Sequence, residues 1–303
     1  MIGRWSLTAR RTIAQAIPAA LRPDAWKLWS AFRLSGPAGL ASAIDELLGV
    51  WRPSTRSIHY KGFTLFFGRG SVIIPDVAGG RTWEKLVSER IVDALARCLG
   101  GVFVDVGANL GLTTLNVLAA LPSTRVFAFE PGFRQAELLS KTISANGLTR
   151  QVTSYRVALG ETAGTRLFAV HDRRFDAFDG FVDTGRAPLR RIVKVETQTL
   201  DGWWHAAHCP PVGVIKLDTE GSELWILRGA VELVARLQPI IVLEIQPANL
   251  HGYPHRAEDV LDWLCSHGYE VETLEGAPVS AANAPQHLTS QENFVARPIS
   301  RFA

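Results

Sequence analysis

The sequence has only three cysteines, Cys98, Cys209 and Cys265, and it contains no CxxC pair. An odd number of scattered cysteines argues against a disulfide framework, and the absence of metal-ligand spacing argues against a structural zinc site. This cysteine usage is typical of a reducing compartment, so we expect a cytoplasmic protein.

Long apolar runs are also missing, since no stretch approaches the roughly 18 residues that a membrane-spanning helix needs. The net charge of +3 is spread along the chain, and without clustered Lys and Arg we expect no nucleic-acid partner. Three arginines precede an apolar stretch, Ile13–Leu21, which Gln15 and Pro18 interrupt. A secretory signal is therefore disfavoured, while peripheral membrane contact of this N-terminal region stays open.

With 303 residues, of which 47% are hydrophobic, the chain is long enough for one large domain with an appendage. Residues 1–80 predict an extension of short helices and a β-hairpin, the hairpin formed by Phe63–Phe67 and Val72–Ile74. Residues 81–303 predict the main domain, with a β-rich insertion at 160–200 that contains strands at Leu167–Val170 and Ile192–Glu196.

Short apolar runs alternate with helical patterns through the main domain. The predicted strands are Val102–Val106, Arg125–Phe129, Gln151–Val157, Val212–Leu217, Pro239–Ile245, Tyr269–Leu274 and Asn293–Arg297. The predicted helices are Trp83–Cys98, Leu112–Leu121, Phe133–Asn146, Ser222–Leu237 and Ala257–His267. Repeated strand–helix units predict an α/β fold, a doubly wound and mostly parallel sheet with helices on both faces.

A glycine-containing loop, residues 105–111, joins the first strand of this sheet to its helix, where ligands bind in open parallel sheets. Gly107 and Gly111 permit a tight turn and a close approach of backbone to ligand. Glu130 ends the second strand, 19 residues after Gly111, where a carboxylate can accept hydrogen bonds from both ribose hydroxyls. The predicted cofactor-binding residues are Asp105, Gly107, Asn109, Gly111 and Glu130.

Asn109 separates two interpretations of this loop. A dinucleotide fingerprint, G-x-G-x-x-G, requires glycine at position 109 for backbone approach to a pyrophosphate. A sulfonium cofactor has no phosphate, and Asp105 before the turn suits a cationic amino-acid group better than an anion. A nicotinamide-dependent oxidoreductase is therefore a disfavoured alternative.

The sequence resembles the FkbM family of methyltransferases, a branch of the class I, Rossmann-like methyltransferases. The matching stretches are F-V-D-V-G-A-N-L-G (103–111), F-E-P (129–131), N-G-L (146–148), V-A-L-G (157–160), T-L-D (199–201), I-K-L-D-T-E-G-S-E-L (215–224), L-R-G-A (227–230) and L-E-I (243–245). They cover roughly residues 103–246, and the resemblance does not extend to the first 80 residues or so. The resemblance implies S-adenosyl-L-methionine as cofactor and O-methylation of a hydroxyl on a sugar or polyketide-type natural product.

Methyl transfer to an alcohol requires alignment of the acceptor oxygen and gains from a general base. Asp218 and Glu220 follow one strand and Glu244 ends the next, so we predict these three carboxylates as catalytic, with Asp218 the preferred base. For Glu220 and Glu223 the alternative is favourable charge at a helix N-terminus, which accounts for Glu223 as well as a catalytic role does. Asp218, Glu244 and Asn249 are also hard oxygen ligands for a divalent metal. Nothing in their spacing demands a metal, and we predict none.

The insertion at 160–200 interrupts the alternation at the ligand-bearing edge of the sheet, and we predict that it forms the acceptor side of the pocket. Its phenylalanines offer apolar surfaces for a sugar, its aspartates can accept hydroxyl hydrogen bonds, and its arginines suit an anionic group. These residues are Phe175, Phe178, Phe181, Asp172, Asp176, Asp179, Asp183, Arg173, Arg174, Arg186, Arg190 and Arg191. The alternative is a solvated loop with a small local core.

Two further classes remain as alternatives. A nucleic-acid methyltransferase would share the cofactor half, but the chain has neither a Pro-Cys nucleophile pair nor an Asn-Pro-Pro-aromatic run. A non-catalytic cofactor-binding module is disfavoured by the acidic residues at 218–223. The sequence predicts a small-molecule or glycan acceptor without identifying it, and it does not predict the oligomeric state.

Overall fold

The structure is a computed structural model that describes residues 55–68, 71, 73–98, 100–171, 177–280 and 282–299. Apart from Thr55 and Arg56, these residues belong to one compact unit, Ser57–Ala303. The helices and the membrane contact expected before residue 50 lie outside the described residues. Among the helices that are described, none is long and apolar enough to cross a membrane.

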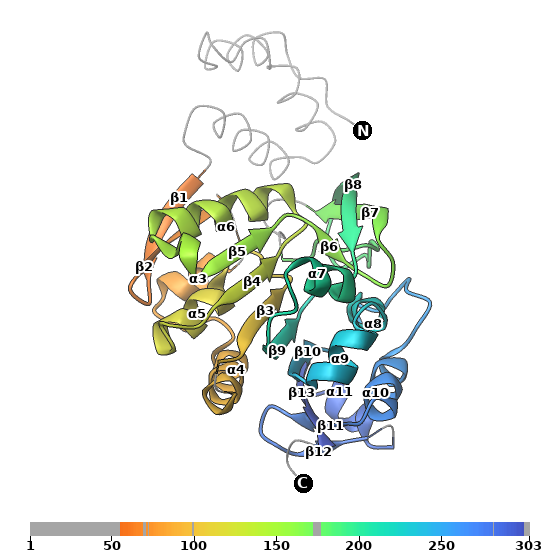
Figure 1. Cartoon of the computed structure of the whole chain (residues 1–303). Helices are drawn as coiled ribbons and strands as arrows, with labels where there is room; N and C mark the ends of the chain where they lie inside the picture. Colours follow the sequence, from red (N-terminus) through yellow and green to blue (C-terminus); the bar gives the residue numbers. More distant parts are fainter. Residues whose placement is uncertain are drawn as a thin grey trace, which may run out of the picture. The chain divides into compact units, whose positions relative to one another are not determined.

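Eight of the described strands form the central sheet, in the order β12-β11-β13-β10-β9-β3-β4-β5 (Figure 1). The parallel strands are β3 (Val102–Val106), β4 (Val126–Phe129), β5 (Val152–Tyr155), β9 (Val212–Leu217) and β10 (Ile240–Glu244). The antiparallel strands are β13 (Asn293–Pro298), β11 (Tyr269–Thr273) and β12 (Pro278–Val279). The chain runs outward from β3 in one direction and then from β9 in the other, so strand order reverses between β3 and β9. This is where an open sheet binds its ligand.

Helices cover both faces of the sheet, as the sequence predicts. One buried cluster packs residues of α4 (Lys85–Arg97), α5 (Leu112–Ala120) and α6 (Phe133–Ala145) on one face. The other cluster holds residues of α7 (Leu200–Ala206), α8 (Glu223–Arg228), α9 (Val231–Leu237) and α10 (Ala257–Ser266). Shorter described helices are α3 (Ile74–Ala78), the 3-10 turn η2 (Leu148–Arg150) and α11 (Ala284–Leu288). The α/β, doubly wound fold is therefore confirmed.

The predicted hairpin exists with a different partner strand. β2 (Phe63–Gly68) contains the predicted Phe63–Phe67, but it pairs with β1 (Thr55–Tyr60). The strand predicted at Val72–Ile74 is wrong, because Ile74 begins α3, with a proline in its first turn. The two-residue turn at Lys61 and Gly62 has positive φ at both positions, 52° and 91°, a conformation typical of tight hairpins. Because most of the first 80 residues lie outside the description, the domain division at residue 80 stays a prediction.

The single helix predicted at Ser222–Leu237 is also wrong, since the chain forms α8 and α9 with a break at Gly229. A Cβ on Gly229 would stand 2.1 Å from the carbonyl oxygen of Gly160, so only glycine permits this approach. The carboxylate of Asp201 accepts hydrogen bonds from the backbone N–H groups of Glu232 and Leu233, which caps α9 as a separate helix.

The insertion is β-rich, as predicted. It forms a three-stranded sheet of β6 (Ala158–Leu159), β8 (Leu189–Gln198) and β7 (Gly164–His171), and the two strands expected from the sequence lie within β7 and β8. The backbone N–H of Gly160 donates to the carbonyl of Gln198 at 2.9 Å. The two ends of the insertion therefore lie next to each other.

Candidate functional site

A cavity of about 360 Å³ opens at the carboxyl ends of β3, β4, β9 and β10. Six of the eight residues predicted for cofactor binding and catalysis line it, namely Gly107, Asn109, Glu130, Asp218, Glu220 and Glu244. Asp105 and Gly111 do not line it. The structure thus brings the predicted cofactor loop and the predicted catalytic carboxylates to one cavity at the switch point of the sheet.

The loop after β3 has left-handed backbone conformations at Gly107, Asn109 and Gly111, with φ values of 80°, 48° and 86°. A Cβ on Gly107 would stand 1.8 Å from the carbonyl oxygen of Asp218, and one on Gly111 would stand 2.6 Å from the side chain of Leu139. Close packing against backbone therefore requires glycine at position 107, whereas at Gly111 the neighbour is the end of a side chain and the positive φ is what favours glycine. From the sequence, these glycines were attributed to a close approach of the backbone to a ligand. The contacts and φ values within the protein explain them without a ligand.

Glu130 is buried beside this loop, with 7% of its surface exposed. Its two carboxylate oxygens accept hydrogen bonds from the backbone N–H of Asn109 at 2.9 Å and of Gly132 at 2.7 Å. Burial raises the pKa of Glu130 to about 8, although these two hydrogen bonds favour the charged form. The carboxylate is thus held in a fixed orientation at the cavity wall, with lone pairs left for ligand hydroxyls.

Below the loop lies a buried charged group that sequence reasoning missed. Lys216 on β9 lines the cavity and donates to Asp218 at 2.8 Å, with Glu84 at 3.2 Å from the same Nζ. Burial opposes its positive charge, but Asp218, Glu84 and Asp105 together hold the pKa of Lys216 well above its usual value. Asp105 is completely buried and accepts a hydrogen bond from Thr114 at 2.6 Å. Its predicted contact with the cofactor remains a prediction.

Asp218, Glu220 and Glu244 form an acidic cluster in which one oxygen of each lies within 4.8 Å of the others. Burial, reinforced by Asp218, raises the pKa of Glu220 to about 8. Burial together with Asp218 and Glu220 raises the pKa of Glu244 well above its usual value. The three carboxylates therefore repel one another in a poorly solvated place, and each needs a partner.

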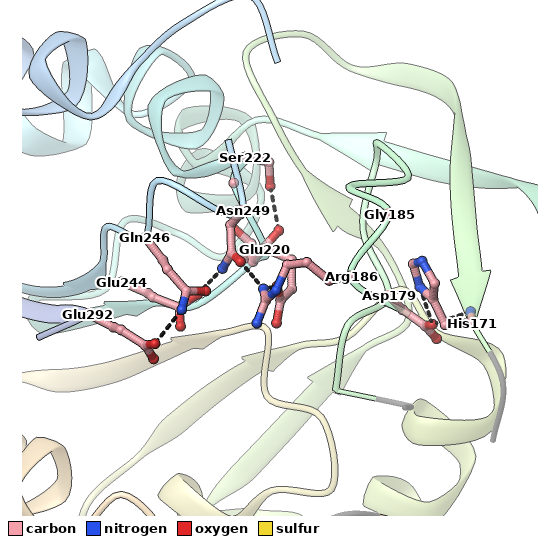
Figure 2. A network of polar contacts seen from close by, with 12 residues as sticks. His171, Asp179, Gly185, Arg186, Glu220, Ser222, Glu244, Gln246, Asn249 and Glu292 are labelled. Carbon is pink, nitrogen blue, oxygen red and sulfur yellow. Dashed lines mark hydrogen bonds and ion pairs between the residues drawn. The ribbon is translucent and has the colours of Figure 1, made fainter. Parts of the chain in front are cut away.

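Besides Lys216 at Asp218, two polar side chains contact Glu220 and Glu244, as Figure 2 shows. Arg186 of the insertion donates to Glu220 at 2.6 Å and to the side-chain oxygen of Asn249. Asn249 in turn donates to Glu244 at 2.6 Å. The Arg186 guanidinium also lies over the Phe178 ring, 4.5 Å from its centroid. From the sequence, Arg186 was predicted to bind an anionic group of the acceptor. In the structure it donates hydrogen bonds to the carboxylate of Glu220 and the side-chain amide of Asn249 instead.

Glu223 lies outside the cavity lining, and its contacts support the alternative of a role at the helix terminus. Its carboxylate accepts from the backbone N–H and hydroxyl of Thr219, at 2.8 and 2.9 Å, at the beginning of α8. Burial raises its pKa to about 7.

The insertion contributes Phe178, Asp179, Phe181 and Arg186 to the cavity wall. Asp179 accepts from the backbone N–H of His171 at 2.7 Å and from Gln135 at 3.0 Å, so it fastens the insertion to α6. Arg190 and Arg191 are on the exposed strand β8, and Asp183 accepts from the backbone N–H of Gly185. The remaining candidates of the insertion, residues 172–176, lie outside the described residues.

The cavity suits the cofactor that the sequence predicts. Phe129, Val157 and Leu159 line it near Glu130, and such an apolar wall beside a fixed carboxylate fits a nucleoside with free ribose hydroxyls. The volume of about 360 Å³ is within the range of small-molecule pockets, roughly 300–1,000 Å³.

Residues 105–271 match the model of the methyltransferase FkbM domain. No curated protein sequence matches the chain significantly. Among solved structures, the chain is similar to the methyltransferase FkbM from Methylobacillus flagellatus KT, with 17% identity, a TM-score of 0.42, and coverage of 65% of this chain and 43% of that one.

Two other solved structures show comparable similarity. One is the precorrin-6y C5,15-methyltransferase from Geobacter metallireducens GS-15, with 17% identity, a TM-score of 0.33, and 56% and 64% coverage of this and that chain. The other is the magnesium protoporphyrin IX methyltransferase from Synechocystis PCC 6803 with bound S-adenosylmethionine, with 12% identity, a TM-score of 0.39, and 76% and 86% coverage. The chain spans less than two thirds of the length of the first two structures.

Proposed function

The chain belongs to the FkbM family of S-adenosylmethionine-dependent methyltransferases, and from this premise we propose that it methylates a hydroxyl group of a sugar or natural-product-type acceptor. The observation that carries the proposal is the single cavity that joins Glu130 and its loop to the carboxylates of Asp218, Glu220 and Glu244. A hydroxyl acceptor needs a nearby base, and this end of the cavity supplies three.

Glu130 is proposed to accept hydrogen bonds from the ribose hydroxyls of the cofactor, and the loop at Gly107 and Asn109 to border its methionine part. When bound, S-adenosylmethionine would supply a methyl group on a cationic sulfur, and this sulfur would leave as a neutral thioether when the methyl group passes to the acceptor oxygen. The protein's share of the reaction is to hold that oxygen in line, to exclude water and to accept the hydroxyl proton.

Within the acidic cluster, the environment favours Glu220 over Asp218 as the base. Lys216 donates to Asp218 at 2.8 Å and Arg186 donates to Glu220 at 2.6 Å, so both carboxylates have a cationic partner. Burial raises the pKa of Glu220 to about 8, near the pH at which general bases are most effective. We therefore assign proton acceptance to Glu220, whereas sequence reasoning prefers Asp218.

The insertion is proposed to form the acceptor side. Phe178 and Phe181 line the cavity and offer the apolar faces on which the C–H surface of a sugar packs. Asp179 is held by His171 and Gln135, so its role on this side is to position the insertion.

The test measures transfer of a labelled methyl group from S-adenosylmethionine to a panel of simple glycosides and macrolide alcohols under single-turnover conditions. Glu220→Gln is expected to lower the rate by about 10²–10⁴-fold with cofactor affinity little changed in calorimetry. The wild-type rate should rise with pH and level off above about 8, the pKa of Glu220.

Asp218→Asn and Glu244→Gln are the matched variants. If Asp218→Asn abolishes transfer while Glu220→Gln keeps it, Asp218 is the base. Label that appears on nucleic acid instead of on any hydroxylated small molecule contradicts the acceptor class. Cofactor binding without any transfer indicates a non-catalytic module.

A further inference from the structure

The acidic cluster of Asp218, Glu220 and Glu244 has the composition of a divalent-cation site, because oxygen ligands from carboxylates are those that such ions prefer. One oxygen of each carboxylate lies within 4.8 Å of the others. Negative charges this close together require positively charged or hydrogen-bonding partners.

The protein itself supplies a partner for every member of the cluster. Lys216 donates to Asp218 at 2.8 Å, Arg186 donates to Glu220 at 2.6 Å, and Asn249 donates to Glu244 at 2.6 Å. Two of these three donors carry a positive charge, so a further cation entering the cluster is repelled by both.

Asn249 is oriented as the link between Arg186 and Glu244. Its side-chain oxygen faces Arg186 and its side-chain nitrogen faces Glu244 (Figure 2). The oxygen that would serve a metal ion as a neutral ligand thus accepts from the guanidinium. The Phe178 ring, 4.5 Å from that guanidinium, holds it from the side of the insertion.

We propose that the guanidinium of Arg186 is the cation of this cluster, and that it acts in place of a divalent metal ion to position Glu220 and Asn249. The inference rests on the proposed function of the same site. Arg186 is then a positioning residue, because it acts through Glu220, and it links the insertion to the orientation of the base.

The test is a Mn²⁺ titration of the full chain, followed by electron paramagnetic resonance and by calorimetry. Arg186→Met removes the charge and is expected to bind Mn²⁺ at least about tenfold more tightly than the wild type, because a unit positive charge at this range repels a divalent ion. Arg186→Lys keeps the charge and should exclude Mn²⁺ as the wild type does. Arg191→Met removes a charge from the exposed face of β8 and should change nothing.

Cooperative thermal unfolding of each variant checks that it is folded, and Arg186→Met with Glu220→Gln should lose the Mn²⁺ that Arg186→Met gains. The proposal is overturned if the wild type binds Mn²⁺ as tightly as Arg186→Met, or if folded Arg186→Met gains no affinity. It is equally overturned if a chelator abolishes wild-type methyl transfer and Mg²⁺ restores it. Because the titration needs no turnover, failure of the proposed methyl transfer leaves its result intact.

Discussion

At the level of single residues, Glu130 holds the loop in place and is also proposed to bind the cofactor ribose. Its carboxylate holds the loop through the N–H groups of Asn109 and Gly132, and the proposed ribose contacts use the lone pairs that remain. Glu130→Gln places an amide N–H₂ against one of these donors, so we expect a loss of about 1–3 kcal/mol in S-adenosylmethionine binding, or roughly 5- to 150-fold. Calorimetry measures it.

Glu137→Gln on the exposed side of α6 is the control for that experiment and should bind the cofactor as the wild type does. A folded Glu130→Gln with unchanged affinity would show that Glu130 serves the loop alone.

Some residues of the site could be predicted from the sequence, and others could not. Asp218, Glu220 and Glu244 were predictable as neighbours, because the ends of parallel strands meet at one edge of a sheet. Lys216 was not, since in the sequence it is one polar residue inside an apolar strand, and its partner Glu84 is 132 positions earlier. The contacts of Arg186 with Glu220 and Asn249 depend on how the insertion folds back, which no local pattern specifies.

At the level of elements, the loop after β3 and the segment after β9 are packed so closely that Gly107 has no room for a side chain. We expect Gly107→Ala to cost about 1–3 kcal/mol more in unfolding free energy than Gly147→Ala, because overpacking adds this amount to the backbone strain that both variants share. Gly147 is a matched control, since its φ is 67° against 80° for Gly107, and a Cβ there meets nothing within 4 Å. Urea unfolding of both variants measures the difference, and equal losses would contradict it.

Phe178 and Asp179 of the insertion were both predicted to contact the acceptor, but their contacts in the structure give them different roles. Phe178→Ala is expected to raise the acceptor KM while cofactor affinity stays unchanged, because Phe178 lines the cavity and contacts Arg186. Asp179→Ala releases both His171 and Gln135, and it also removes a negative charge that raises the pKa of Glu130. It should therefore change cofactor affinity as well. Steady-state kinetics with calorimetry tests this, and identical profiles for the two variants would refute the distinction.

Most elements of the main domain follow from hydrophobic periodicity, although the short elements α7, α11, β6 and β12 were not predicted. Two further departures, the hairpin before the main domain and the break between α8 and α9, have physical causes that the structure shows. The hairpin depends on a left-handed pair at Lys61 and Gly62, and a lysine at that position does not signal such a turn. The break between α8 and α9 depends on Gly229 meeting the backbone of Gly160, a contact between segments far apart in the sequence. A glycine inside a helical pattern is usually tolerated, so the pattern predicted one helix.

For the whole molecule, the buried carboxylates determine how stability depends on pH. The pKa is raised to about 8 in Glu130 and Glu220 and to about 7 in Glu223, whereas an unfolded glutamate titrates near 4.3. Between these values the folded protein binds more protons than the unfolded chain, so its stability falls as pH rises from about 4.5 to about 8 and then levels. Burial lowers the pKa of His255. This single group makes stability rise with pH and so acts against the effect of the carboxyls.

Thermal unfolding of the cofactor-free protein from pH 5 to 9 measures the effect, with the highest melting temperature expected at the acid end. Glu130→Gln should flatten the curve, because it removes one of the contributing carboxyls. A melting temperature that rises with pH across this interval would show that these groups are ionised in the folded protein.

The neighbouring ends of the insertion have a consequence for how such a molecule can diversify. Because residues 160 and 198 are joined by a backbone hydrogen bond of 2.9 Å, everything between them is an excursion that begins and ends at one place. A segment of that kind can be lengthened, shortened or exchanged at a small entropic cost to the rest. If the insertion forms the acceptor side as we propose, a graft from a relative would change what is methylated, provided that it keeps the contacts of Arg186 with Glu220 and of Asp179 with Gln135.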